Sequence, residues 1–445
     1  MKHSPPLGYD LLDHAAQTDV GVRRSHNQDA FGVFPANSPD VWSDRGHIFL
    51  VADGMGAHAV GELASQLASD LIVHTYSKHA TTGPVAAVRR AFTEANTTIH
   101  QRGQQNREFQ GMGTTATACF IRPEGVWIGH VGDSRAYRIR GDYIEQLSFD
   151  QSLQWELARR QQVSPDRIAG VPSNVIVRSL GPEPNVQVDI EGPHPLLPDD
   201  IFVLCSDGLS NQLSDQEMGA TLSHLPLAEA CKFLVEVANL RGGPDNITVV
   251  AVRVADPERD PEETADSTTM RKVQNRKPSR RRASFSWQSL PWAPLAVGMG
   301  IILALGAVLL LTSELKTAAV ITFAFAGAVL MAGIFGLVQK YRRDAERDAD
   351  QPAGPPQVYR RNLCAVDVPL MERLMQTEKG LVELTRQKNW PMNWDAHSKH
   401  HSAAILAFQQ GDLKLAFTEL VRALSVLLNV LREHRQRDEQ FKPNW

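Results

Sequence analysis

Acidic residues that follow short apolar runs are the feature of this sequence best suited to chemistry. They occur in four places: Asn27-Gln28-Asp29, Asp53-Gly54, Ser206-Asp207-Gly208 and Asp245-Asn246. Each motif alone fits a turn, because Asp hydrogen-bonds to its own backbone and Gly accepts positive φ. Strand ends in one sheet system can converge, however, and a cluster of carboxylates needs divalent cations to neutralise it.

The residue types also indicate which metal such a cluster would take. Carboxylate and water ligands suit magnesium or manganese, and no group of His and Cys accompanies the acidic motifs, which argues against zinc. The sequence has four cysteines, which lie far apart without a CxxC pair and outside any phosphate-cradling motif: Cys119, Cys205, Cys231 and Cys364. We therefore expect reduced thiols and no cysteine nucleophile.

The elements that must position these carboxylates lie between about residues 15 and 253. Runs such as 47–52, 114–121 and 201–205 are rich in β-formers and predict strands that end in turns. The apolar spacing over 61–79 and 84–101 predicts helices with one buried face. The sequence therefore indicates a mixed domain of strands and helices.

Six motifs follow one another through this region: Arg24-x2-Asn27-Gln28-Asp29, Asp53-Gly54-Met55-Gly56, Gly111-Met112-Gly113-Thr114-Thr115, Gly132-Asp133-Ser134-Arg135, Cys205-Ser206-Asp207-Gly208-Leu209 and Asp245-Asn246-x-Thr248. In this order they resemble the bacterial type 2C (PPM) protein phosphatases. The resemblance implies an α+β fold, a four-layer α/β/β/α sandwich of two antiparallel sheets with the metals at one end.

The resemblance also implies metal-binding roles. Asp53 would bridge two ions, with the Gly54 carbonyl completing one of the two sites. Asp207 and Asp245 would hold the other ion, and Asp29 would bind through metal waters. The implied cofactors are Mn²⁺ or Mg²⁺.

Two further positions take their roles from the resemblance. Asp133 resembles the residue that, with Asp207, forms a third metal site in bacterial members. Arg24 resembles the phosphate-binding arginine, which makes Arg24 and Asp53 the implied catalytic residues.

The implied function is hydrolysis of phosphoserine and phosphothreonine in proteins. A water that bridges two cations would have a lowered pKa and attack phosphorus directly. A catalytically weak or inactive fold that binds phosphoproteins as a scaffold is the alternative, but it has no need for a full set of metal ligands. A receptor for external ligands is a third interpretation. The loop 313–316 argues against it, because four residues leave no room for a sensor domain.

The sequence departs from the family pattern near the metals. Animal members place a histidine, a proposed general acid, where Met55 stands. The sequence therefore does not identify the residue that donates a proton to the leaving group, and His58 is one candidate. Ala57 replaces a usual glycine. After the fourth motif the family usually carries Asp-His-Ser, whereas this chain has Asp-Gln-Ser at 150–152. The segment 152–170 resembles the flap that follows that motif.

The rest of the chain divides by composition. We expect a catalytic domain over 1–254, a polar basic linker over 255–293 and a transmembrane hairpin over 294–339. The two uncharged runs of that hairpin, 295–312 and 317–338, would each be ~27–33 Å long as helices. A helical region over 340–445 would follow, with one tetratricopeptide-like hairpin around Gly411.

These features led to expectations about location and partners. Basic flanks on both sides of the hairpin predict a multi-pass protein of the inner membrane with both ends in the cytoplasm. The expected partners are phosphorylated proteins, among them a membrane-bound serine/threonine kinase, and membrane lipid. The net charge of -4 argues against nucleic acid. His397, His400 and His401 favour a solvated helix face over a metal site, because no acidic partner is evident nearby in the sequence.

Overall fold

The computed structural model describes residues 9–10, 12–56, 60–168, 170–172, 175–255 and 353–440, with side chains to 434, and a few residues between 322 and 331. The chain forms two compact units, one made of 1–259 and 353–445 and the other of 260–352. The first unit holds every acidic motif of the sequence, and its fold is the one that matters for the site.

Two six-stranded sheets form the centre of this unit, and neighbouring strands in both are antiparallel. The first sheet has the order β1 (Leu12–Asp19), β11 (Ile247–Val254), β10 (Ile201–Cys205), β7 (Arg135–Arg140), β8 (Tyr143–Gln146) and β12 (Arg360–Leu363). The second has the order β2 (Asp29–Phe34), β3 (His47–Met55), β5 (Ala116–Arg122), β6 (Gly125–Val131) and β9 (Asp189–His194), with β4 (Gly113–Thr114) paired to β3.

Apolar side chains on the inner faces join the two sheets. Phe49 and Val51 of β3 share one buried cluster with Phe202 of β10 and Val250 of β11. The alternating apolar residues of these strands thus bury one face of each sheet against the other.

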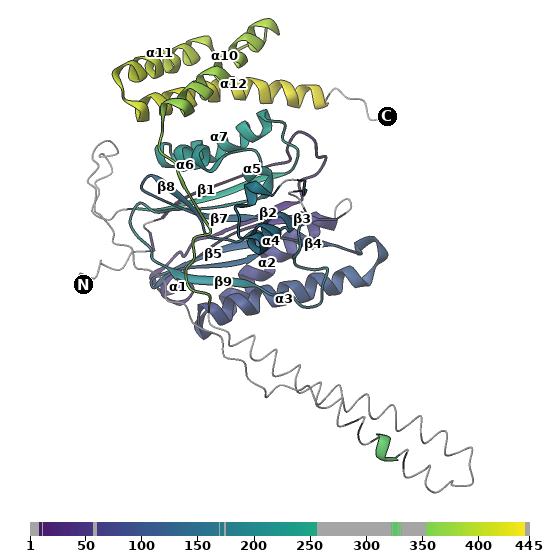
Figure 1. Ribbon diagram of the computed structural model, residues 1–445. Helices are drawn as coiled ribbons and strands as arrows, with labels where there is room; N and C mark the ends of the chain where they lie inside the picture. The colour runs from purple at the N-terminus through teal and green to yellow at the C-terminus, as the bar shows by residue number, and fades with distance from the viewer. Residues whose placement is uncertain are drawn as a thin grey trace, which may run out of the picture. The chain divides into compact units, whose positions relative to one another are not determined.

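Helices cover the outer faces (Figure 1). Helices α2 (Val60–His79) and α3 (Pro84–Gln105) pack on the second sheet, while α6 (Asp215–His224) and α7 (Leu227–Leu240) pack on the first. The predicted α+β sandwich of two antiparallel sheets is therefore confirmed. Shorter elements complete the unit: α1 (Pro39–Asp44), η1 (Ala80–Thr82), η2 (Arg107–Phe109), α4 (Leu153–Gln161), η3 (Pro165–Arg167) and α5 (Asp207–Ser210).

The C-terminal region forms three helices, α10 (Val368–Gln387), α11 (Trp394–Gln410) and α12 (Leu413–Gln440). Gly411, with φ +81°, joins α11 to α12 in a close antiparallel pair at the point where the sequence predicted a hairpin. Helix α12 packs on α7, and the Lys232 ammonium donates to Asn429 Oδ1 at 2.8 Å.

A strand that the sequence did not predict ties this region to the catalytic fold. β12 adds to the edge of the first sheet by pairing with β8. Immediately afterwards Cys364 is buried against Gly219 of α6, and upstream the Tyr359 hydroxyl donates to Glu191 of β9. A four-residue edge strand carries too little alternation to be recognised from sequence.

The predicted location as a multi-pass protein of the inner membrane is contradicted. Within the part of the chain that the structure describes, no helix is long and apolar enough to cross a bilayer. The long helices α3 and α12 are amphipathic, with polar residues opposite their buried stripes. The predicted spans 295–312 and 317–338 lie outside the described residues, apart from the few between 322 and 331, and so does the linker from 256 onward.

Candidate functional site

Strand ends bring the predicted carboxylates to one end of the sandwich. Asp29 opens β2 directly opposite Asp53 of β3 in the antiparallel register. Asp207 follows β10 and opens α5, and Asp245 stands two residues before β11. Repulsion from Asp29, Asp207 and Asp245 acts on Asp53, so these side chains form one cluster.

The backbone on both sides of Asp53 is fixed by two threonines. The Asp53 amide donates to Thr115 Oγ1 at 2.9 Å. The Asp53 carbonyl accepts from the Thr115 amide at 2.8 Å and from Thr114 Oγ1 at 2.9 Å. The buried Thr115 hydroxyl also contacts Ser134 Oγ at 2.7 Å. This strand end therefore cannot move without breaking buried hydrogen bonds.

Asp29 is oriented by hydroxyls from the other sheet. Its Oδ2 accepts from Ser206 Oγ at 2.8 Å and from Thr248 Oγ1 at 2.7 Å. Its Oδ1 is buried and has no hydrogen-bond partner among the described residues. An acceptor in that situation needs a cation or a water.

Asp245 lies at the rim of the cluster. Arg24, whose side chain is 49% exposed, donates to Asp245 Oδ2 at 2.7 Å. Asn246, the next residue, accepts from the Gln28 amide and donates to the carbonyls of Val20 and His26. The loop that carries Arg24 is thus held against the segment 245–246 that precedes β11.

Asp133 lies on the other side of Asp207, in the turn between β6 and β7. It is 5% exposed, and its Oδ1 has no hydrogen-bond partner among the described residues. Asp133 and Asp207 line a small cavity of about 20 Å³ together with Arg135 and Asp150. A cavity of this size holds about one water or ion.

Burial and mutual repulsion raise the pKa values of the carboxylates in this cluster. Burial, more than the neighbouring carboxylates, raises the pKa of Asp29 to about 7. The same two causes raise the pKa values of Asp53, Asp133 and Asp207, with a hydrogen bond to Asp53 and the charge of Arg135 lowering that of Asp207. The end of the sandwich is therefore built for cations.

Two glycines allow the chain segments to approach closely here. A Cβ on Gly54 would overlap the Gly61 carbonyl, and a Cβ on Gly208 would overlap the Asn246 carbonyl. Any side chain at either position would push the strand ends apart.

Gln151 has a structural role that its sequence position did not reveal. It replaces the usual histidine, and its Oε1 accepts from the Gly132 amide at 2.9 Å while its Nε2 donates to Asp189 at 2.8 Å. Its neighbour Asp150 accepts from Arg135 at 2.8 Å. Gln151 thus connects the turn before Asp133 to β9.

The structure brings the predicted residues Arg24, Asp29, Asp53, Gly54, Asp133, Asp207 and Asp245 to the same end of the two sheets. Sequence reasoning missed the residues that orient them: Thr115, Ser134, Ser206, Asn246 and Thr248. All of these lie within the quoted motifs, and the hydroxyl and amide side chains of those motifs were the available signal. Ala57, which replaces a usual glycine, and His58, the candidate proton donor, lie outside the described residues.

Comparison with known proteins agrees with this arrangement. The family model described as protein phosphatase 2C matches residues 20–241. The serine/threonine phosphatase stp of Listeria innocua is 36% identical over 244 residues, which cover 53% of this chain and 93% of that relative. The protein phosphatase PhpP of Streptococcus pneumoniae is 37% identical over 242 residues, covering 53% of this chain and 94% of that relative.

Among solved structures, the chain is similar to the serine/threonine phosphatase PstP/Ppp of Mycobacterium tuberculosis. The identity is 30% and the TM-score 0.49, with 55% of this chain and 99% of that chain covered. The family match, the two relatives and the ordered acidic motifs all fall on the same part of the sequence. The chain belongs to the protein phosphatase 2C family and is a serine/threonine phosphatase.

Proposed function

We propose that the chain hydrolyses phosphoserine and phosphothreonine in phosphorylated proteins, in a reaction that depends on two divalent cations, Mn²⁺ or Mg²⁺. The observation that carries this proposal is the cluster of Asp29, Asp53, Asp207 and Asp245 at one end of the sandwich. A fold that only bound phosphoproteins would gain nothing from four mutually repelling carboxylates.

The residues present fit such ions. Asp29 Oδ1 is buried and no described residue donates to it. The ligand atoms of the cluster are all oxygens, which suit Mn²⁺ and Mg²⁺. Asp53, the Gly54 carbonyl, Asp207 and Asp245 would hold the ions, with Asp29 behind their waters. When bound, the cations supply Lewis-acid activation of water and neutralise charge on the phosphoryl oxygens.

Arg24 would bind the phosphoryl group of the substrate. Its guanidinium lies at the exposed rim and is paired with Asp245. A phosphate oxygen offers the same planar, charge-assisted contact as that carboxylate, so the substrate can take over one side of the guanidinium. Arg24 would then orient phosphorus toward the buried carboxylates.

A third ion is part of the proposal. Three carboxylates, those of Asp133, Asp150 and Asp207, line the small cavity, and Asp133 Oδ1 has no hydrogen-bond partner among the described residues. Arg135 lies in the same lining and lowers the pKa of both carboxylates, so it would weaken this ion relative to the other two.

A larger cavity of about 330 Å³ would receive the peptide around the phosphorylated residue. It is lined by Ser210, Ser214 and Asp215 near α5 and α6, and by Arg360 and Asn362 of β12. Arg135 lines both this cavity and the small cavity beside Asp133 and Asp207, so the larger cavity adjoins the carboxylate cluster. The C-terminal strand would thus contribute to substrate binding.

Hydrolysis of a phosphothreonine peptide by the full chain tests the proposal. We expect turnover with Mn²⁺ or Mg²⁺, none with chelator, and none in Asp207→Ala, whereas Asp70→Ala on the exposed face of α2 should behave as the wild type. Turnover that survives in Asp207→Ala would contradict the metal assignment. Absence of turnover with either metal would instead favour the scaffold interpretation.

A further inference from the structure

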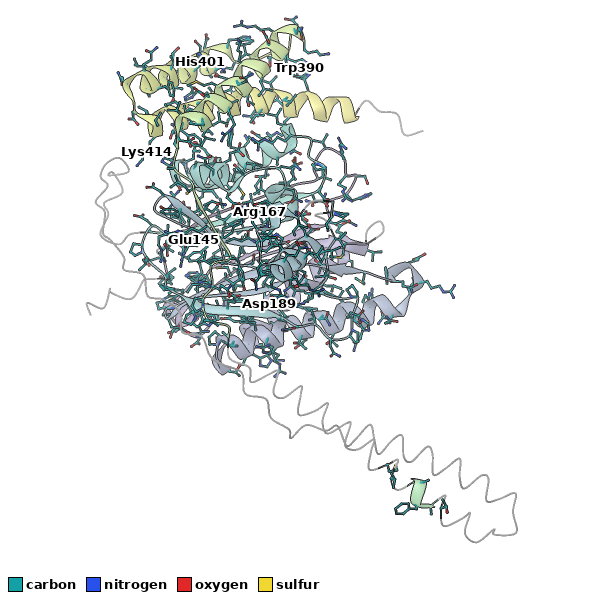
Figure 2. The ribbon with its side chains drawn as sticks, viewed as in Figure 1. Glu145, Arg167, Asp189, Trp390, His401 and Lys414 are labelled. Atoms are coloured by element: carbon teal, nitrogen blue, oxygen red, sulfur yellow. The ribbon has the colours of Figure 1, made fainter. Side chains whose placement is uncertain are left out.

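Helices α10 and α11 bring an acidic residue to two histidines that the sequence left without a partner. Glu378 comes from α10, and His397 and His401 stand four residues apart on one face of α11. One donor atom from each lies within 4.8 Å of the other two. Figure 2 shows His401 among the side chains of these C-terminal helices.

The three donor atoms converge on one point. Glu378 Oε1 lies 2.8 Å from His401 Nδ1 and 2.8 Å from His397 Nε2. The two imidazole rings are nearly parallel, with an interplanar angle of 18° and centroids 5.7 Å apart. Although His397 Nε2 lies this close to the carboxylate, it is buried and has no hydrogen-bond partner among the described residues.

The burial of these groups makes that geometry significant. Glu378 is 3% exposed and His397 is 7% exposed, while the Trp394 ring meets the His397 ring edge to face. A carboxylate in such surroundings requires a charged partner. Burial lowers the pKa of His397. The nitrogen of a neutral imidazole offers a lone pair to a metal ion.

We propose that Glu378, His397 and His401 form a zinc site that fastens α10 to α11. Two imidazoles spaced i, i+4 on a helix and a carboxylate from a neighbouring element are a donor set that Zn²⁺ prefers. The side chain of His401 is 45% exposed, so a water can take the fourth position of a tetrahedral site.

Little movement is needed to admit the ion. Zinc–nitrogen and zinc–oxygen bonds of about 2.0–2.1 Å place tetrahedral ligands ~3.3 Å apart. The present contacts of 2.8 Å would therefore open by about half an ångström, which the partly exposed His401 and the flexible Glu378 side chain can provide. The Arg386 guanidinium lies over the Trp394 ring and disfavours a cation nearby, so we expect a moderate affinity.

The neighbouring histidine supplies a matched control. His400 lies on the same helix but contacts Glu419 at 2.7 Å, and Glu419 is also paired with Arg422. His400 takes no part in the zinc cluster. A substitution there removes an imidazole of similar position without removing a ligand.

Zinc binding to the full chain, saturated beforehand with Mg²⁺, tests the site. We expect the wild type and His400→Ala to bind one more equivalent of Zn²⁺ than His401→Ala and Glu378→Gln. X-ray absorption should show imidazole scattering only in the first two proteins. Co²⁺ should give intense visible bands of tetrahedral coordination there and only weak bands in the other two.

Zinc held at the catalytic carboxylates would appear equally in all four proteins, so it cancels in the comparison. Far-UV circular dichroism in chelator checks that each variant keeps its helices. Equal zinc stoichiometry in wild type and His401→Ala, without imidazole scattering, would overturn the proposal even if phosphatase activity were normal.

Discussion

Asp29 and Asp53 stand directly opposite each other across the antiparallel pair β2–β3. Like charges in this arrangement destabilise a sheet, and both residues are half-buried. The hydroxyls of Ser206 and Thr248 hold Asp29, and Thr115 holds the Asp53 backbone. The fold therefore maintains a repulsive pair that a bound cation would relieve.

Asp53→Asn should separate stability from activity. Removing one charge relieves the repulsion, so the free energy of unfolding in chelator should rise by about 1–3 kcal/mol. Turnover with Mn²⁺ should fall by about 10²–10³-fold or more, because the residue central to the cluster is lost. Urea unfolding and phosphopeptide hydrolysis measure the two effects, and exposed Asp70→Asn should change neither. Lower stability in chelator would contradict the repulsion argument.

Thr115→Val tests whether the hydroxyl network positions Asp53. Valine keeps the shape but leaves the Asp53 amide and Ser134 Oγ without their partner, which should lower the free energy of unfolding by about 1–3 kcal/mol. As the loss of a group that orients a metal ligand, it should also weaken the apparent Mn²⁺ affinity by about 10–100-fold. Thr115→Ser should restore both quantities. A valine variant with unchanged Mn²⁺ dependence would show that Thr115 only packs.

Much of this site could be predicted from the sequence because it lies in short motifs. Asp29, Asp53, Asp207 and Asp245 each stand at a strand end, and turn chemistry and strand patterns are local signals. The partners of these carboxylates come from elsewhere in the chain. Thr248 lies 219 positions from Asp29, and no local pattern indicates that the two meet.

Contacts between distant parts of the sequence were also missed in the C-terminal region. A helical region was expected there from a tetratricopeptide-like pattern around Gly411, but β12 was not expected. The pairing of His397 with Glu378 was also missed, because the two residues lie on different helices. Tertiary packing, rather than local preference, decides these contacts. The predicted membrane location, which rested on the length of two uncharged runs and on their basic flanks, is contradicted because no helix of the described residues is long and apolar enough to cross a bilayer.

Gly219→Ala should disturb the docking of the C-terminal segment. A Cβ at this position of α6 would overlap the Cys364 side chain, with Sγ at only 2.8 Å. We expect a loss of about 1–3 kcal/mol in the free energy of unfolding, despite the better helix propensity of alanine. Gly380→Ala on α10, where a Cβ meets nothing within 4 Å, should be neutral or stabilise by up to about 1 kcal/mol. Thermal unfolding of both variants provides the comparison, and equal responses would argue against tight packing at Cys364.

Arg360→Ala should weaken the binding of an acidic phosphopeptide. Its guanidinium lines the larger cavity, 3.6 Å from both Asp166 and Asp215. Loss of one charge-assisted contact worth about 1 kcal/mol should raise KM about fivefold with little change in kcat. Arg361→Ala is the control, because that side chain lies over the Tyr143 ring on the opposite face of β12. Wild type and both variants should hydrolyse a small aryl phosphate equally. An equal KM of Arg360→Ala and wild type for the peptide would show that the cavity does not bind the peptide.

Glu191 should make the stability of the catalytic unit depend on pH. Burial raises the pKa of its carboxyl from 4.5 to about 7, although the Tyr359 hydroxyl opposes this by donating to it. A folded-state pKa above the unfolded value means that the protonated carboxyl stabilises the fold. This stabilisation is complete below about pH 4.5 and is lost as the pH rises through 7.

Glu191→Gln stays neutral at every pH and can still accept from Tyr359. Relative to wild type, its free energy of unfolding should therefore be similar at pH 4.5 and larger by about 1–2 kcal/mol at pH 8, after discounting for the partial exposure of the side chain. The titration of the catalytic carboxylates is common to both proteins and cancels. Urea unfolding at pH 4.5, 6 and 8 measures the difference, with exposed Glu108→Gln as the control. A constant difference across this range would mean that Glu191 ionises as readily in the folded chain as in the unfolded one.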